Sequence, residues 1–157
     1  MIPSIKFIPS KKLVGLSLTM SFADNKTAEL WRSFIPRRKE IANTFSNDLY
    51  SLQVYNENFF SQFNPTAEFT KWALVEVTDF NEVPKGMQMF TLPEGQYAVF
   101  HYKGSSAKGA EVMGYILQEW LPHSGYQLDN RPHFEVLGEK YRNNSDESEE
   151  EIWIPIR

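Results

Sequence analysis

The sequence predicts an α+β fold: duplicated β-α-β-β units, related by a pseudo-two-fold axis, form an antiparallel sheet with helices on one face and a ligand groove on the other. Three observations support this prediction. Several short segments alternate apolar and polar residues, as half-buried strands do, and two longer segments have the apolar spacing of amphipathic helices. The order strand, helix, strand, strand then occurs in both halves of the chain.

The first half begins with an alternating segment of Leu and small or polar residues, which predicts a strand ending near Phe22. Asp24, Asn25 and Thr27 follow, and each of them can cap the start of a helix. Pro36 should disturb that helix, because proline lacks the backbone N–H that a helix interior needs. The predicted strands of this half are residues 11–22, 49–55 and 71–80.

The second half repeats these features, with a helix predicted at residues 107–122 and Ser105 or Ser106 as its cap. The loop before it, GSSAKG, lacks the spacing of a phosphate-binding P-loop. Its predicted strands are residues 87–104, 133–141 and 150–156. The helices share a pattern of aliphatic, aromatic and proline residues: Leu30, Trp31, Phe34, Ile35 and Pro36 in the first, and Ile116, Leu117, Trp120, Leu121 and Pro122 in the second. We therefore expect a single domain, residues 1–157, with internal copies at roughly 1–82 and 83–157.

The composition excludes several classes of function. The net charge is −4 and the basic run Arg37–Lys39 is short, so direct DNA binding is not expected. The chain has no Cys, which rules out disulfides and thiolate chemistry. No apolar run approaches the roughly 20 residues of a membrane span and no signal peptide begins the chain, so we expect a cytoplasmic protein without membrane contact.

Catalytic and metal-binding patterns are scarce. His101, His123 and His133 form no metal-spaced pair, and the acidic run DESEEE lacks the alternating ligands and turn glycine of a calcium loop. There is no G-x-S-x-G nucleophile motif. We therefore expect no metal and no cofactor. The aromatic content of 15% exceeds what a small core usually needs, which predicts that some rings line a cavity.

Period-two alternation assigns the strand residues to faces. In the last strand, Ile152 and its alternate neighbours should lie beneath the helices and Trp153 should point away from them. In FEV, the apolar Phe134 and Val136 should lie beneath the helices, which leaves Glu135 on the opposite face. A slip of one residue would turn Glu135 toward the helices.

The helix-free face is thus expected to collect acids and indole rings, a combination suited to a flat organic cation. The candidate ligand-binding residues are Glu135, Trp72, Glu76, Trp153, Tyr55 and Tyr102. Two alternatives stay open for Glu135, which are exposure to solvent and a hydrogen bond to a backbone amide or a neighbouring tyrosine.

Three segments of the chain are distinctive: VEVTDFNEVPKGMQMFTLPEGQYAVFHYKG, ILQEWLPHSGYQLDNRPHFEVL and EEIWIPI. Together they resemble the GyrI-like small-molecule-binding family, also known as the AraC-type effector-binding domain, and IPSKKLVGLSL fits the first strand of that family. The resemblance implies a duplicated β-α-β-β fold with a ligand groove, and a drug-sensing role in AraC-type and MerR-type regulators. It also implies that a glutamate at the position of Glu135 meets cationic aromatic compounds.

Two departures from the family pattern affect this expectation. Leu137 stands where the family often has an aromatic residue, so one stacking wall is missing. No helix-turn-helix accompanies the domain, so direct control of transcription by this chain is not expected.

The leading hypothesis is a stand-alone binding protein for hydrophobic, cationic aromatic molecules. Some family members hydrolyse cyclopropane-bearing genotoxic compounds, so the first alternative is a hydrolase in which Glu135 or Glu76 directs water. The second alternative is a docking surface for a protein partner such as DNA gyrase or a regulator.

Overall fold

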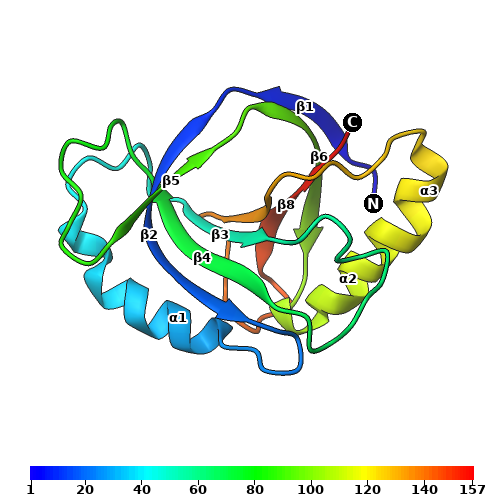
Figure 1. Cartoon of the computed structure of the whole chain (residues 1–157), viewed down its shortest axis with the longest axis horizontal. Coiled ribbons are helices and arrows are strands. Elements are labelled where there is room, and N and C mark those ends of the chain that lie inside the picture. Colours follow the sequence, from blue (N-terminus) through cyan, green and yellow to red (C-terminus); the bar gives the residue numbers. More distant parts are fainter.

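A single antiparallel sheet of eight strands organises the chain, and the computed structural model describes all residues from Met1 to Arg157 (Figure 1). The strand order is β1-β6-β8-β7-β3-β4-β2-β5. The strands are β1 (Ser4–Ile8), β2 (Lys11–Met20), β3 (Leu49–Val54), β4 (Phe69–Glu76), β5 (Gln88–Leu92), β6 (Gly95–Lys103), β7 (His133–Leu137) and β8 (Glu149–Pro155). The sheet curls strongly, and the predicted α+β fold is confirmed.

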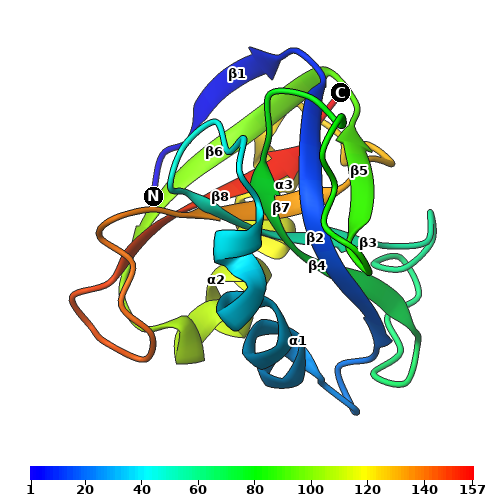
Figure 2. The same cartoon turned by 90° about the vertical axis from the view of Figure 1, so that its left-hand side faces the viewer.

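The helical segments lie on one side of this sheet (Figure 2). They are α1 (Thr27–Phe34), the 3₁₀ segment η1 (Ile35–Glu40), the 3₁₀ turn η2 (Ser106–Lys108), α2 (Gly109–Tyr115), the π-helical η3 (Ile116–Trp120) and α3 (Leu121–Ser124). Pro36 lies in the first turn of η1, so it converts the end of the first helix into a tighter helix, as predicted. Ser105 caps η2, because its hydroxyl accepts a hydrogen bond from the backbone N–H of Ala107 at 3.1 Å. None of the helices is long and apolar enough to cross a membrane.

The strand order is symmetric about the central pair β3 and β7. Moving outward from β3 the strands are β4, β2 and β5, and moving outward from β7 they are β8, β6 and β1. The edge strand of each side comes from the other half of the chain, since β1 pairs with β6 and β5 pairs with β2. The expected halves 1–82 and 83–157 therefore share their edge strands, and their origin by duplication stays a prediction.

Two details of the strands differ from the sequence prediction. The segment 87–104 forms two strands, β5 and β6, because Pro93 interrupts it and Gly95 adopts a φ of 159°. Residues Ser4–Ile8 form an additional edge strand, β1, in which only Ile8 is buried. A strand with so little apolar burial gives a weak alternation signal, which explains why it was not predicted.

Both faces of the sheet are covered by apolar side chains. The helix-covered face packs against α1 through residues such as Val14 and Val75, and against α2 through residues such as Phe100 and Ile154. The helix-free face has its own buried cluster, which is Ile8, Leu13, Tyr50, Leu52, Leu74, Leu92, Tyr97, Val99, Phe134 and Trp153. Because the sheet curls around this cluster, its helix-free face is filled by side chains of the chain itself.

Candidate functional site

Glu135 lies on the helix-covered face of the sheet, and its predicted placement on the helix-free face is wrong. It pairs directly with Ile152 of β8 and Ser51 of β3, and directly paired residues point to the same face. Ile152 packs in the cluster beneath α2. The prediction fails because Phe134 packs against Trp153 in the helix-free cluster, where apolar burial is as complete as it is beneath the helices.

The two predicted tryptophans do lie on the helix-free face, but they are core residues there. Trp72 packs on Phe90 with ring centroids 4.9 Å apart. Trp153 stacks on Phe134 at 5.1 Å, and the ammonium group of Lys6 lies 5.6 Å from its ring centroid. The chain itself therefore supplies the stacking and cation partners of Trp153.

Glu76 also faces away from Glu135, and its carboxylate has partners within the chain. Lys11 Nζ lies 3.3 Å from Glu76 Oε1, and the Tyr50 hydroxyl donates to the same oxygen at 3.3 Å. Glu76 is thus paired on the helix-free face, and a shared site with Glu135 is excluded by the strand registers.

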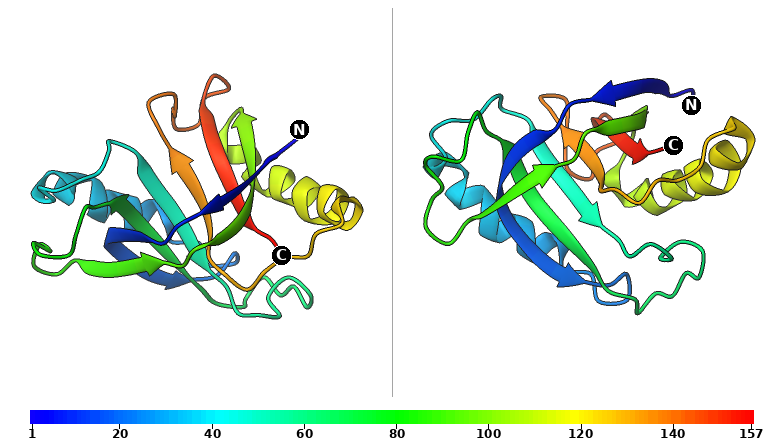
Figure 3. Two further views of the ribbon diagram at one scale, coloured as in Figure 1. Left: turned by 90° about the horizontal axis from the view of Figure 1, so that it is seen from above. Right: turned by 45° about the horizontal axis from the view of Figure 1, so that its top comes forward.

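The central strands β3 and β7 lie between the helices rather than beneath them (Figure 3). α1 packs over β2 and β4, whereas α2 packs over β6 and β8. On this face β3 and β7 present three cross-strand pairs, which are Leu49–Leu137, Ser51–Glu135 and Gln53–His133. We call these six residues the central seam. The seam is polar at its Ser51–Glu135 and Gln53–His133 pairs, and the apolar clusters beneath α1 and α2 lie on either side of it.

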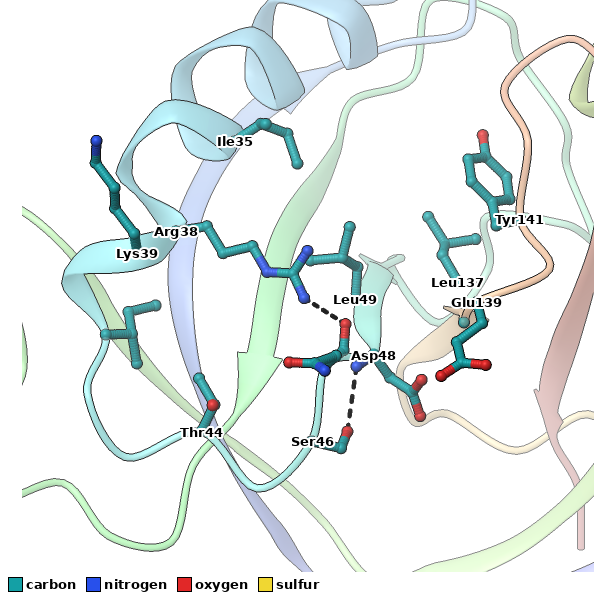
Figure 4. Close-up of a pocket in the computed structure, with 13 residues that line it drawn as sticks. Ile35, Arg38, Lys39, Thr44, Ser46, Asp48, Leu49, Leu137, Glu139 and Tyr141 are labelled. Atoms are coloured by element: carbon teal, nitrogen blue, oxygen red, sulfur yellow. Dashed lines mark hydrogen bonds between the residues drawn. The ribbon is translucent and has the colours of Figure 1, made fainter.

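A cleft of about 680 Å³ opens at the Leu49–Leu137 end of the central seam, between η1 and the loop that follows β7 (Figure 4). Ile35 and Tyr141 belong to its walls. The guanidinium of Arg38 donates to the backbone carbonyl of Asn47 at its rim. The next same-face pair along β3 and β7 is Ser51–Glu135, which adjoins the cleft in the strand register but does not line it.

The Glu135 carboxylate is half-buried and has no ion pair within 4.0 Å. Its one hydrogen bond comes from Gln53 Nε2, at a long distance of 3.5 Å. Burial raises the pKa of Glu135, while the positive charge of Lys71 and the Gln53 amide oppose that rise. A poorly hydrated carboxylate with so few partners favours a cation brought from outside the chain.

Glu150 is a second carboxylate on this face that the sequence prediction missed. It alternates with Ile152 and Ile154, so the same period-two pattern places it on the helix-covered face, diagonally across from Glu135. Its side chain makes no ion pair. Burial raises the pKa of Glu150 to about 7, the negative charge of Glu135 adds to the rise, and Lys71 opposes it.

Burial and the negative charges of these carboxylates raise the pKa of two nearby tyrosines. Burial raises the pKa of Tyr55, and the charge of Glu135 raises it further. Burial also raises the pKa of Tyr141, with Glu150 and Glu135 as further causes. Tyr102, in contrast, donates its hydroxyl to the Ser105 carbonyl at 2.8 Å beneath α2, which is a structural role.

His133 occupies the buried end of the central seam. It is 5% exposed, and burial lowers its pKa to about 3, so the ring is neutral at physiological pH. The rings of Tyr55 and Phe60 pack on it, with centroid distances of 5.0 and 5.4 Å. Its Nδ1 has no hydrogen-bond partner. No group of three or more His, Asp or Glu side chains is arranged to hold a metal ion.

Comparisons with known proteins agree with this architecture. The sequence model of the GyrI-like small molecule binding domain matches residues 1–157. The transcriptional regulator BrlR of Pseudomonas aeruginosa is 30% identical over 150 residues, which are 94% of this chain and 53% of BrlR. The chain therefore spans about half the length of this curated relative.

Solved structures that share the fold include the following two. SAV2435, solved bound to tetraphenylphosphonium, has a TM-score of 0.73 at 20% identity, covering 100% of this chain and 94% of SAV2435. A hydrolase encoded by lin2189 from Listeria innocua has a TM-score of 0.62 at 13% identity, covering 99% of this chain and 92% of the hydrolase.

Proposed function

Because this chain belongs to the GyrI-like small molecule binding domain family, we propose that it binds hydrophobic organic cations at the central seam, with Glu135 as the main counter-charge. The observation that carries this proposal is the half-buried Glu135 carboxylate, which has no ion pair and a single long hydrogen bond. The likeness to SAV2435, solved with a phosphonium cation, supports the charge of the ligand.

Attraction to a cation is strong here because little water screens it. The attraction between two opposite charges grows as the local dielectric constant falls, and burial of Glu135 at the seam lowers that dielectric constant. The ring of Tyr55, beside Glu135, adds a cation–π contribution of about 0.5–2 kcal/mol. The cleft at the Leu49–Leu137 end provides the way in and the apolar contact.

Titration calorimetry with tetraphenylphosphonium tests the proposal. We expect Glu135→Gln to weaken binding at least tenfold, because the amide keeps the shape of the side chain but not its charge. Glu139→Gln is the matched control, since it removes a charge from the exposed rim of the cleft. Equal affinity of the wild type and Glu135→Gln would contradict the proposal.

A hydrolytic function is the second candidate, and the pair Glu135–Glu150 is the observation that favours it. Two carboxylates on the same face of adjacent strands, both with a raised pKa, can divide the roles of base and acid. Glu135 would take a proton from water, and the protonated Glu150 would give one to the leaving group. The pair Glu135–Glu76 cannot do this, because the two side chains lie on opposite faces of the sheet.

Incubation with a cyclopropane-bearing alkylator followed by mass spectrometry tests the hydrolase. We expect a product 18 Da heavier than the substrate if water is added, formed by the wild type and not by Glu150→Gln. Unchanged substrate at high protein concentration would remove this candidate and leave ligand binding in place.

A further inference from the structure

We propose that the central seam selects cations that carry N–H groups, such as amidinium ions, over quaternary onium ions of the same charge. The inference rests on the proposed function and names the class of ligand. It follows from the balance of hydrogen-bond donors and acceptors at the seam and at Glu150 on the adjoining strand β8, where acceptors are in excess.

The two carboxylates supply most of the free acceptors. An ionised carboxylate has about four lone-pair sites for hydrogen bonds. Glu135 uses one of them, for the 3.5 Å contact with Gln53 Nε2, and the Glu150 side chain makes no hydrogen bond within the chain. An onium ion such as tetraphenylphosphonium neutralises the charge but has no hydrogen-bond donor. Its binding would therefore remove water from the carboxylate oxygens without giving them new hydrogen bonds.

His133 provides an observation independent of the acids. Its side chain is 95% buried on the same face as Glu135, two residues away along β7, and Nδ1 has no partner. A neutral imidazole offers one ring nitrogen as an acceptor. Buried polar atoms without partners are rare in folded proteins, and a bound molecule commonly completes them. Nδ1 is enclosed by protein atoms, so a ligand N–H group would reach it only where the rings of Tyr55 and Phe60 move aside.

The chain has few donors of its own at this place. The Gln53 amide is shared between Ser51 Oγ and Glu135 Oε1, each at 3.5 Å. Burial raises the pKa of both carboxyls and the positive charge of Lys71 opposes that rise, but the Lys71 ammonium group forms no ion pair with either of them. The donors are therefore expected from the ligand.

The spacing of the two carboxylates suits a planar cation with several N–H groups. Diagonal neighbours on one face of an antiparallel pair have Cα atoms about 7–8 Å apart. Glu135 and Glu150 stand in this relation across β7 and β8, so their side chains can converge on one group between them. An amidinium ion has four N–H bonds in one plane and can donate to both carboxylates at once.

A matched pair of probes tests this selection by titration calorimetry at pH 8. The first probe is 4-phenylbenzamidinium, and the second is its N,N,N′,N′-tetramethyl derivative, which keeps the charge and the aryl groups but has no N–H. We expect the first to bind the wild type at least tenfold more tightly. The preference should fall below threefold in Glu150→Gln. Glu149→Gln should retain it, because this neighbouring carboxylate is held at 2.7 Å by His101 instead.

Each outcome separates the two proposals. If both probes bind the wild type equally and both lose affinity in Glu135→Gln, the N–H preference is wrong and cation binding stands. If neither probe nor tetraphenylphosphonium binds, the proposed function fails and the preference fails with it. A preference that is unchanged in Glu150→Gln would come from the bulk of the methyl groups, and it would overturn the role of this carboxylate. A thermal melt of each variant checks that it is folded.

Discussion

Phe134 of β7 stacks on Trp153 of β8, with ring centroids 5.1 Å apart and planes 15° apart. Because successive residues of a strand point to opposite faces, this stack turns the next side chain, Glu135, toward the helices. The orientation of the proposed ligand-binding acid thus depends on an apolar contact on the other side of the sheet. This separation of roles makes stability and binding independently testable.

Truncating the stacked ring should affect stability and leave binding intact. Phe134 is 1% exposed, so Phe134→Leu should lower the free energy of unfolding by about 1–3 kcal/mol, through lost burial and a small cavity. The affinity for tetraphenylphosphonium should change less than twofold, because the ring faces away from the central seam. Urea unfolding followed by tryptophan fluorescence, together with calorimetry, measures both quantities. A large loss of affinity in the folded variant would place the ligand on the helix-free face.

The two predicted glutamates should behave differently when they are neutralised. Glu76→Gln breaks the ion pair with Lys11 and should lower stability by about 1 kcal/mol, since the pair is partly buried. Its affinity for tetraphenylphosphonium should equal that of the wild type, whereas Glu135→Gln should bind at least tenfold more weakly. The reverse ranking of the two variants in calorimetry would show that the ligand contacts Glu76.

The sequence pattern predicted most of the elements, because alternation and helix signals are local. It assigned Trp72 and Trp153 to the helix-free face correctly, since Ala73 and Ile152 lie beside them in strands with several consistent alternations. In β7 the apolar positions of one face are only Phe134 and Val136, and they fit either side of a sheet that is buried on both sides. The face of Glu135 therefore depended on the register with β8, which is a non-local property.

The second acid could have been found from the sequence. Glu150 has the same parity as Ile152, Ile154 and Ile156, so an assignment of these residues beneath a helix also assigns Glu150 to that face. It was missed because it lies within the acidic run DESEEE, which is typical of a solvated loop. The unpartnered Nδ1 of His133 and the isolation of Lys71 depend on distances across strands, and no pattern in the sequence reports them.

A glycine in β2 permits the close approach of β4. A Cβ atom on Gly15 would overlap the backbone carbonyl oxygen of Ala73, so Gly15→Ala requires the two strands to move apart. We expect a loss of more than about 3 kcal/mol of stability, because both strands lie in the buried part of the sheet. Gly114→Ala is the control, since no atom lies within 4 Å of the added methyl group. This substitution should raise the free energy of unfolding by about 0.4–1 kcal/mol, because alanine restricts the unfolded chain more than glycine does. Similar melting temperatures for the two variants would contradict the close packing.

Stability should depend on pH through Glu150. Its pKa is raised from 4.5 to about 7 in the folded protein, so the unfolded chain releases this proton at lower pH than the folded chain does. Stability from this group is therefore lost as the pH rises from 4.5 through 7. Glu150→Gln removes the effect, so its melting temperature should exceed that of the wild type at pH 8 and match it near pH 4.5. A variant that is less stable than the wild type at pH 8 would show that the ionised carboxylate has a favourable partner.

The same proton should control the affinity for cations. Tetraphenylphosphonium does not titrate, so a change in its affinity between pH 6 and pH 8 must come from the protein. We expect tighter binding at pH 8, because ionisation of Glu150, with a pKa of about 7, adds a second negative charge beside Glu135. Lys71 on β4 and Tyr141 in the loop after β7 also face this carboxylate. Burial raises the pKa of Tyr141, so its hydroxyl stays protonated across this range.

Calorimetry in buffers of different ionisation enthalpy measures this coupling directly. At pH 6 the bound cation should lower the pKa of Glu150 and release part of a proton, because a nearby positive charge favours the ionised carboxylate. Glu150→Gln should release none and should bind with an affinity that is constant from pH 6 to pH 8. A pH dependence that persists in Glu150→Gln would assign the proton to Glu135, whose pKa is also raised by burial. Binding that weakens as the pH rises would mean that the ligand site lies away from both carboxylates.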